Sequence, residues 1–240
     1  MIDIHPAHHA ASTWRDFFIH IATIVLGLLI ALSLEQSIEL VHHRAQRREL
    51  IQDLRGEAEK RISRKEASMK FFAVNESWYR NCLRAARDAK PAGGYVTFVL
   101  PDRPPLKIPP QRPEDAVWAS AKASGKVEVL STEETEAWGR VDFLGSRSEA
   151  ASEAYQAAST AARATADHIG SSLAPGASMH VTPEERDEFT RALGTLIETE
   201  QAFLRSAIYW ESASDAVLHG AYTLDAMQPY FDHASQTIPH

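Results

Sequence analysis

Residues 17–34 read FFIHIATIVLGLLIALSL and contain no formally charged side chain. A helix of this length rises about 27 Å, which is close to the thickness of the hydrocarbon core of a bilayer. Arg15 and Asp16 precede this apolar run and Glu35 follows it. We therefore predict a single transmembrane helix over residues 17–34, preceded by an N-terminal tail over residues 1–16.

Two other readings of the apolar run are a buried helix of a soluble protein and a cleaved signal peptide. A buried soluble helix is seldom apolar on every face. Ala31 and Ser33 have the small-x-small spacing of a cleavage site, but the run is longer than a typical signal-peptide core of about 7–15 residues. The basic charge before it is also small, because Arg15 is opposed by two aspartates. An uncleaved anchor is the favoured interpretation.

Positive charge near the ends of the run predicts its orientation. One basic residue precedes it, whereas three arginines follow it closely, so the positive-inside rule places the C-terminal part in the cytoplasm. A periplasmic location is the alternative, since long domains can be exported regardless of charge. His20 lies one turn inside the run, near enough to its end to reach the interface. The residues expected at the membrane interface are Trp14, Arg15, His20, Arg44, Arg47 and Arg48.

Within the apolar run, small residues recur every four positions, at Thr23, Gly27 and Ala31. They form one face of a helix, and close backbone approach at such a face is a common source of helix association in lipid. The expected partners are therefore the lipid bilayer and either a second copy of the chain or other membrane protein subunits. The alternative is that these residues are simply frequent in membrane helices.

The whole chain has 240 residues, of which 44% are hydrophobic, and a formal net charge of −7. This charge argues against a nucleic-acid-binding protein that relies on bulk positive charge. Cys82 is the only cysteine, which excludes an intramolecular disulfide and a multi-cysteine zinc or iron–sulfur site.

Residues 35–89 contain no proline and carry an apolar stripe at helical spacing, so we predict one unbroken stalk helix that enters a bundle. Residues 90–112 form a proline-rich loop by composition. At most a short β arm fits there, with residues 95–100 paired with residues 106–108. A proline-rich recognition ligand is the alternative to a connecting loop.

Start and stop signals predict three further helices in residues 113–228. A short helix begins at Pro113 and ends at Gly125, with Trp118 as its core anchor. Capping boxes at Ser131/Glu134 and Thr182/Glu185 start helices that run to about residues 169 and 227. The last helix carries an apolar side chain at every seventh position, namely Phe189, Leu196, Phe203, Trp210, Val217 and Leu224. We predict an all-α fold with an antiparallel bundle and a C-terminal tail over residues 229–240.

No recognised catalytic or cofactor-binding motif is present, and we predict no cofactor. Glu39 and His42 have the E-x-x-H spacing of di-iron bundle ligands, and His43 is adjacent, but no second such pair follows. These three residues are weak metal candidates; a surface pair at the membrane boundary is the favoured reading. Three N-terminal histidines (His5, His8, His9) and the pair Asp215/His219 offer no complete catalytic arrangement.

Several short segments together resemble a family. Trp14-Arg15-Asp16-Phe17-Phe18, the run GLLIAL at residues 27–32, and His42-His43-Arg44 are similar to the start of uncharacterised bacterial single-pass membrane proteins. Val117-Trp118, Ser124-Gly125 and residues 127–130 resemble a signature farther along those proteins. The resemblance implies an N-terminal anchor, a helical domain and a location in the bacterial inner membrane, and no activity. Some of its members have basic N-terminal tails that imply an exported domain, and this chain lacks such a tail.

These observations predict a non-enzymatic interaction, scaffold or sensor protein that is anchored in the membrane and is oligomeric or an accessory subunit of a complex. A membrane-tethered, metal-dependent enzyme with histidine and carboxylate ligands inside the bundle is the alternative.

Overall fold

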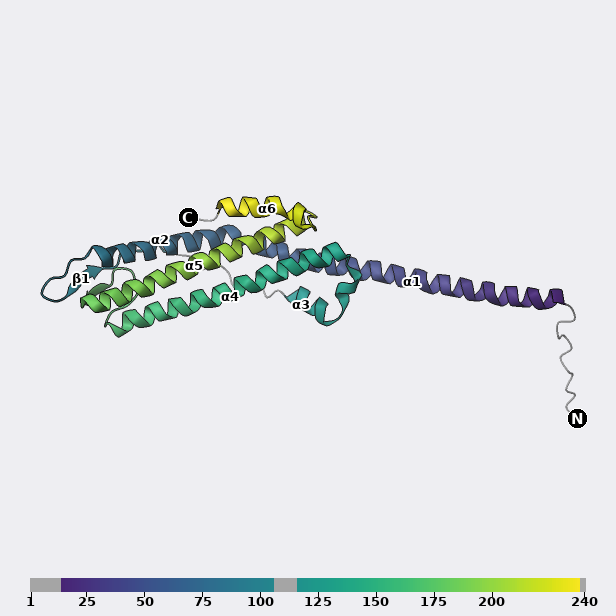
Figure 1. Ribbon diagram of the computed structural model, residues 1–240, viewed down its shortest axis with the longest axis horizontal. Helices are drawn as coiled ribbons and strands as arrows, with labels where there is room; N and C mark the ends of the chain where they lie inside the picture. The colour runs from purple at the N-terminus through teal and green to yellow at the C-terminus, as the bar shows by residue number, and fades with distance from the viewer. Residues whose placement is uncertain (1–13, 106–115, 238–240) are drawn as a thin grey trace, which may run out of the picture. The chain divides into compact units, whose positions relative to one another are not determined.

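The computed structural model describes residues 14–105 and 116–237 (Figure 1). The described helices are α1 (Trp14–Ile62), α2 (Lys65–Asp88), α3 (Ala116–Ala123), α4 (Thr132–His168), α5 (Pro183–Leu218) and α6 (Leu224–Thr237), with a 3-10 helix, η1, at Lys126–Val129. Two short strands, β1 (Val96–Val99) and β2 (Ser178–Val181), complete the secondary structure. The predicted all-α fold class is confirmed. The chain divides into two compact units between Glu49 and Leu50.

The first unit contains the N-terminal part of α1. Its most apolar stretch has no buried side chain, although bulky residues such as Ile24, Leu28 and Ile30 lie within it. This helix is long enough and apolar enough to cross a membrane. Charged side chains follow the apolar stretch without interrupting the helix, because no proline or glycine stops it there.

The second unit is a helical bundle built around α5. Helix α4 lies along α5, and α2 and α6 also pack against α5 (Figure 1). Five of the six residues in the predicted seven-residue repeat lie on α5 and are buried: Phe189, Leu196, Phe203, Trp210 and Val217. The small residues of α4 allow it to approach α5 closely, with Ser148, Ala158 and Ala162 buried.

Both predicted capping boxes are confirmed and begin the two long helices of the bundle. The Glu134 amide donates to Ser131 Oγ at 3.2 Å, and the Ser131 amide donates to the Glu134 carboxylate at 2.9 Å. Thr182 and Glu185 form the same reciprocal pair at 3.2 and 2.8 Å. The side chains thereby satisfy amides that have no partner inside the first helical turn. Helix α4 ends just before Gly170, whose φ is +73°.

The prediction of an unbroken helix over residues 35–89 is wrong at one point. A two-residue turn at Ser63 and Arg64 separates α1 from α2. The Arg64 amide bonds to the Arg61 carbonyl, three residues back, and the Ser63 hydroxyl donates to the Lys60 carbonyl. Serine hydroxyl groups compete in this way with the helical hydrogen bonds of their neighbours.

The prediction of a single helix from Pro183 toward residue 227 is also wrong. Helix α5 ends at Leu218, because Gly220 adopts a φ of +80° and the Ala221 amide bonds back to the Ala216 carbonyl. Helix α6 then begins at Leu224, where the Thr223 hydroxyl accepts the Ala226 amide at 3.3 Å. It contains Pro229 and continues through most of the predicted C-terminal tail. The apolar repeat crosses this break, so its last member, Leu224, is exposed.

The predicted β arm forms, but with a different partner. β1 pairs in antiparallel register with β2, so that Val96 faces Val181 and Phe98 faces Met179. These four side chains are buried and close one end of the bundle core. The partner expected for the arm, residues 106–108, lies outside the described residues.

The predicted short helix is described from Ala116 to Ala123, and its predicted start at Pro113 lies outside the described residues. Trp118 is buried as predicted, and Gly125 ends the helix with a φ of +73°. A carboxylate of α1 bonds to the first described turn of α3. Glu57 Oε1 accepts hydrogen bonds from the Ala116 and Val117 amides at 3.1 Å each. Helix α3 is thereby held against the part of α1 that belongs to the bundle.

Candidate functional site

The three metal candidates predicted from sequence lie on exposed positions of the first unit. Glu39 Oε1 lies 3.8 Å from His43 Nε2, whereas His42 Nε2 contacts the amide of Gln46 at 2.9 Å. Thus Glu39 faces the histidine four residues on, and the E-x-x-H pair itself does not form a contact. Within residues 14–105 and 116–237, no three histidine, cysteine or acidic side chains gather in a way that could hold a metal ion.

The residues predicted for the membrane interface and for helix packing are exposed along the first unit. Trp14 stacks on Phe18, with ring centroids 5.7 Å apart. The Thr23 hydroxyl donates to the Ile19 carbonyl at 2.9 Å, so its hydrogen-bonding capacity as a donor is used within its own helix. Exposed side chains of this set at the two ends of the apolar stretch are Arg15, His20, Arg44, Arg47 and Arg48.

The pair Asp215 and His219 comes together as its spacing predicts. Asp215 Oδ1 lies 3.3 Å from His219 Nδ1, and both side chains are largely exposed. His219 Nδ1 also lies 2.9 Å from the Asp215 carbonyl. This is a polar contact at the C-terminal end of α5, and the ring of Tyr230 lies 6.0 Å from that of His219. The three N-terminal histidines lie outside the described residues.

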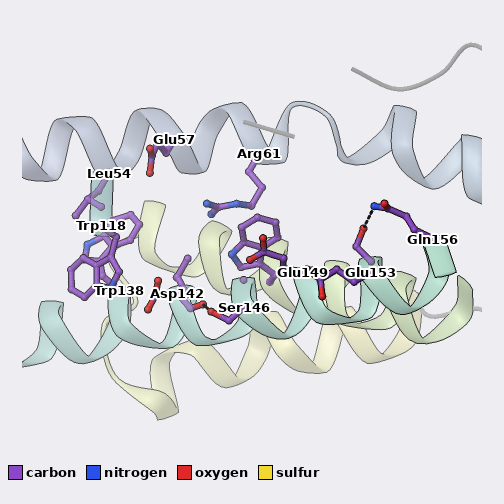
Figure 2. A pocket seen from close by; sticks show the side chains of 14 residues that line it. Leu54, Glu57, Arg61, Trp118, Trp138, Asp142, Ser146, Glu149, Glu153 and Gln156 are labelled. Atoms are coloured by element: carbon purple, nitrogen blue, oxygen red, sulfur yellow. Dashed lines mark hydrogen bonds between the residues drawn. The ribbon is translucent and has the colours of Figure 1, made fainter. Parts of the chain in front are cut away.

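A groove of about 640 Å³ opens in the second unit, and the sequence did not predict it (Figure 2). Helix α1 supplies one wall, α4 the opposite wall, α3 one end and α5 the floor (Figure 2). It is lined by Leu54, Glu57, Arg61, Trp118, Trp138, Val141, Asp142, Gly145, Ser146, Glu149, Ser152, Glu153, Gln156 and Trp210. All of these residues belong to the same compact unit.

Aromatic rings form much of the groove. Trp118, Trp138 and Trp210 come from three different helices. The guanidinium of Arg61 lies 4.0 Å from the centre of the Trp210 ring and also donates to the Ser214 hydroxyl. Gly145 provides room for this ring, because a Cβ at that position would lie 3.0 Å from Trp210 Nε1.

Four carboxylates line the groove against the one arginine. Glu57 is engaged by the amides at the start of α3, and Asp142 forms an ion pair of 2.8 Å with Lys122. Glu149 and Glu153 are exposed and have no hydrogen-bond or ion-pair partner in the part of the chain that the structure describes. These two carboxylates lie one helical turn apart on α4, so their charges are concentrated in one section of the groove.

An apolar section of about 310 Å³ continues from the groove. The two share Arg61, Ser152, Gln156 and Trp210. Apart from these shared residues, the section is lined by apolar side chains of α2 and α5 and by three polar ones, namely Met69, Phe72, Phe203, Leu204, Ala207 and Ile208 together with Arg64, Ser68 and Glu211. The combined surface therefore changes along its length from an acidic, aromatic section to one that is more apolar but retains charged side chains.

A second unusual group, Glu200, is buried in the core beyond the groove. Its side chain is fully buried, and neither carboxylate oxygen has a hydrogen-bond partner in the described chain. Burial and the nearby Glu76 carboxylate raise the pKa of Glu200 to about 8. Glu76, by contrast, accepts hydrogen bonds from Arg80 and Gln201 at 2.7 Å each. Glu200 is therefore held in its neutral form at neutral pH.

Burial also raises the pKa of three further groups of this core, Tyr79, Cys82 and Tyr155. Burial raises the pKa of Tyr79 and of Tyr155, and the two phenol groups share a hydrogen bond. Cys82 is fully buried, and its burial raises the pKa of the thiol to about 12. A neutral, enclosed thiol is a poor nucleophile.

Sequence patterns treated the groove residues one at a time and missed their convergence. Trp118 and Trp210 carried the signals of core residues, and both are indeed largely buried. Glu149 and Glu153 resembled ordinary solvent-facing positions. The one feature of the sequence that relates to the groove is the presence of these acids and Gly145 on the same stretch of α4. This feature indicates a groove only once it is known which helix lies opposite that stretch.

Comparison with protein families, with curated proteins and with solved structures finds no match to this chain.

Proposed function

We propose that this chain is a non-enzymatic interaction or sensor protein that is anchored in a bacterial inner membrane by its N-terminal helix. The observation that carries the proposal is the apolar stretch of α1, in which no side chain is buried. Within residues 14–49, its bulky apolar side chains remain exposed. Water is an unfavourable environment for an apolar surface of this extent, whereas lipid accommodates it.

The bundle supports a binding role in place of a catalytic one. Its groove presents aromatic rings and carboxylates, and the buried Cys82 lies away from the groove residues in a separate core cluster. Such surfaces bind a ligand or a partner without needing an activated nucleophile. We infer that the bundle binds a ligand or a partner, and that the N-terminal helix holds the bundle at the membrane.

Purification of the chain, together with any subunits bound to it, from native membranes tests this proposal. We expect the tagged full-length chain to stay with the membrane after a high-salt wash and to need detergent for extraction. Intact mass measurement of the extracted particle should then give a homo-oligomer or a stoichiometric complex with other membrane subunits. Release of the chain by salt alone would contradict the anchor.

Substitution of Gly27 by Leu is expected to dissociate that particle. Gly27 is the middle of the small-residue face, and a leucine there holds two helix backbones apart. Val25→Leu is the matched control, because residue 25 lies on the opposite side of the helix and its side chain is already bulky. The intact mass of each variant particle is the readout. An unchanged particle for Gly27→Leu would show that this face is not the contact.

We also propose that the bundle lies on the cytoplasmic side, on the basis of Arg44, Arg47 and Arg48 after the apolar stretch. Cys82 cannot report sidedness, since its thiol is fully buried. Ala157→Cys places a thiol on the exposed surface of α4, and the natural chain then serves as the unlabelled control.

For this variant we expect an impermeant maleimide to label the new thiol only after the inner membrane is opened. Labelling of cells in which only the outer membrane is permeable would place the bundle in the periplasm. The fraction labelled before and after opening, measured by mass spectrometry, decides between the two locations.

A further inference from the structure

Two acidic side chains are buried between α2 and α5. Glu200 of α5 is fully buried, and neither of its oxygen atoms has a hydrogen-bond partner in the described chain. Glu76 of α2 is also buried, and its Oε1 accepts a hydrogen bond from Gln201, the residue next to Glu200, at 2.7 Å. The protein therefore supplies hydrogen-bond donors to one acid of this interface, and the described chain supplies none to the other.

The titratable groups around Glu200 belong to α2, to α4 and to the segment after β1. They are Glu76, Tyr79, Arg80 and Cys82 on α2, Tyr155 and Arg163 on α4, and Arg103 after β1. Arg80 bonds to Glu76 at 2.7 Å, while Arg103 and Arg163 lie within electrostatic range of Tyr79. The nearby charge that acts on Glu200 is that of Glu76, and burial together with this charge raises the pKa of Glu200 to about 8. Ionisation of Glu200 would thus place two like charges in one apolar interface.

An ionised carboxylate at this position needs water. A charge without partners in a protein interior is strongly unfavourable, and a local opening that admits water removes this cost. Helix α2 is the element best placed to move, because its contact with α5 is much less extensive than that of α4. The turn at Ser63 and Arg64 also separates α2 from α1. Rotation about this turn would expose Glu76 and Glu200 to solvent while α4 stays on α5.

We propose that ionisation of Glu200 moves α2 away from α5 about the turn at Ser63 and Arg64, so that the bundle opens reversibly as the pH rises. The movement separates Phe72 of α2 from Phe203 of α5, whose ring centroids lie 5.1 Å apart in the closed bundle. Both rings line the apolar section beside the groove, so the opening enlarges an apolar surface. The role of this opening as a signal rests on the proposed sensor function, whereas the opening itself does not.

Hydrogen exchange of the full-length chain in dodecyl maltoside, an uncharged detergent, tests this movement. Exchange of the amides of α2 and of α4 is followed by mass spectrometry at pH 6, 7 and 8, under conditions in which the rate follows the population of the open state. At each pH the rate for the natural chain is divided by the rate for Glu200→Met, which cannot ionise at this position. The pH dependence of the exchange chemistry is the same in both chains and cancels in this ratio.

For α2 we expect this ratio to rise about tenfold from pH 6 to pH 7, because the open state releases a proton that the closed state keeps. The rise should be smaller from pH 7 to pH 8, as the pH approaches the pKa of about 8 in the closed bundle. For α4 we expect a constant ratio, since this helix keeps its contact with α5.

Two further variants separate the charge of Glu200 from its shape. Glu200→Gln keeps the length and the polarity of the side chain but cannot ionise, so it should give the same result as Glu200→Met. Glu198→Gln is the matched control, because Glu198 is an exposed acid on the same helix, and this variant should exchange as the natural chain does.

A ratio for α2 that does not change with pH would overturn the proposal. An equal rise for α2 and α4 would also overturn it, because the whole bundle would then be unfolding. Membrane association after a high-salt wash is recorded for every variant. A chain that opens with pH but is released by salt contradicts the anchor alone, and a chain that stays in the membrane with a constant ratio contradicts the opening alone.

Discussion

Replacement of Glu200 by methionine is expected to stabilise the protein and to remove much of the pH dependence of its stability. The Glu200 carboxyl is fully buried and has no hydrogen-bond partner in the described chain, so its removal leaves no partner unsatisfied. Methionine has a similar length and an apolar surface. Exchange of a buried, unsatisfied polar group for an apolar one of similar shape is often stabilising.

The direction of the pH effect follows from the raised pKa. The pKa of Glu200 is about 8 in the folded state, against an ordinary value of 4.5 that applies when the chain is unfolded. Between these two values the unfolded state releases the proton and the folded state keeps it. The free energy of unfolding therefore falls as the pH rises through this window, by up to about 1.4 kcal/mol per pH unit. Above pH 8 both states are ionised and the loss is complete.

The measurement is denaturant unfolding of the full-length chain in an uncharged detergent between pH 5 and pH 8. We expect the difference in stability between Glu200→Met and the natural chain to grow with pH, which separates this group from histidines that titrate in both proteins. Glu198→Met is the matched control, since Glu198 is an exposed acid on the same helix. A difference that stays constant across this pH range would show that Glu200 is ionised in the fold.

Truncation of Phe189 to alanine is expected to cost about 3–5 kcal/mol of stability. This side chain is fully buried and is the first member of the seven-residue repeat on α5. Its ring centroid lies 6.1 Å from that of Phe98 on β1, so it joins the long helix to the sheet. The truncated side chain leaves a cavity bounded by both elements, and neither can move in to fill it without distorting the other.

Phe143→Ala provides the comparison for this effect. Phe143 is 58% exposed on α4, and we expect its truncation to change the free energy of unfolding by no more than about 0.5 kcal/mol. Chemical unfolding of both variants under one set of conditions measures the contrast. Similar values for the two would mean that the Phe189 environment is not packed as the structure describes.

The helices were predictable because their signals are local. Ser131 and Thr182 each meet a glutamate three residues later, and the repeat from Phe189 to Val217 follows one helix face. The break at Gly220 was not predicted, since the apolar repeat continues across it to Leu224. At that point, the left-handed backbone of one glycine outweighed an apolar repeat of six members that spans residues 189–224.

The sheet and the groove were not predictable because each depends on distant residues. β1 had the composition of a strand, but its partner follows α4, and nothing nearby in sequence indicates this. The groove needs Arg61 of α1 and Glu149 of α4 to lie opposite one another across α5. A pattern within one helix shows which face is apolar, but it does not show which other helix that face meets.

The pairing of β1 with β2 has a consequence for how the chain folds as it is made. Thr97 bonds to His180, a residue 83 positions later, whereas only residues 169–182 separate α4 from α5. Closing the longer loop costs more chain entropy, and at the usual rates of synthesis about 80 residues take roughly 4–16 s to appear. During that interval β1 leaves the ribosome with an unpaired edge. The sheet is therefore a late step of folding, completed only when the second half of the bundle arrives.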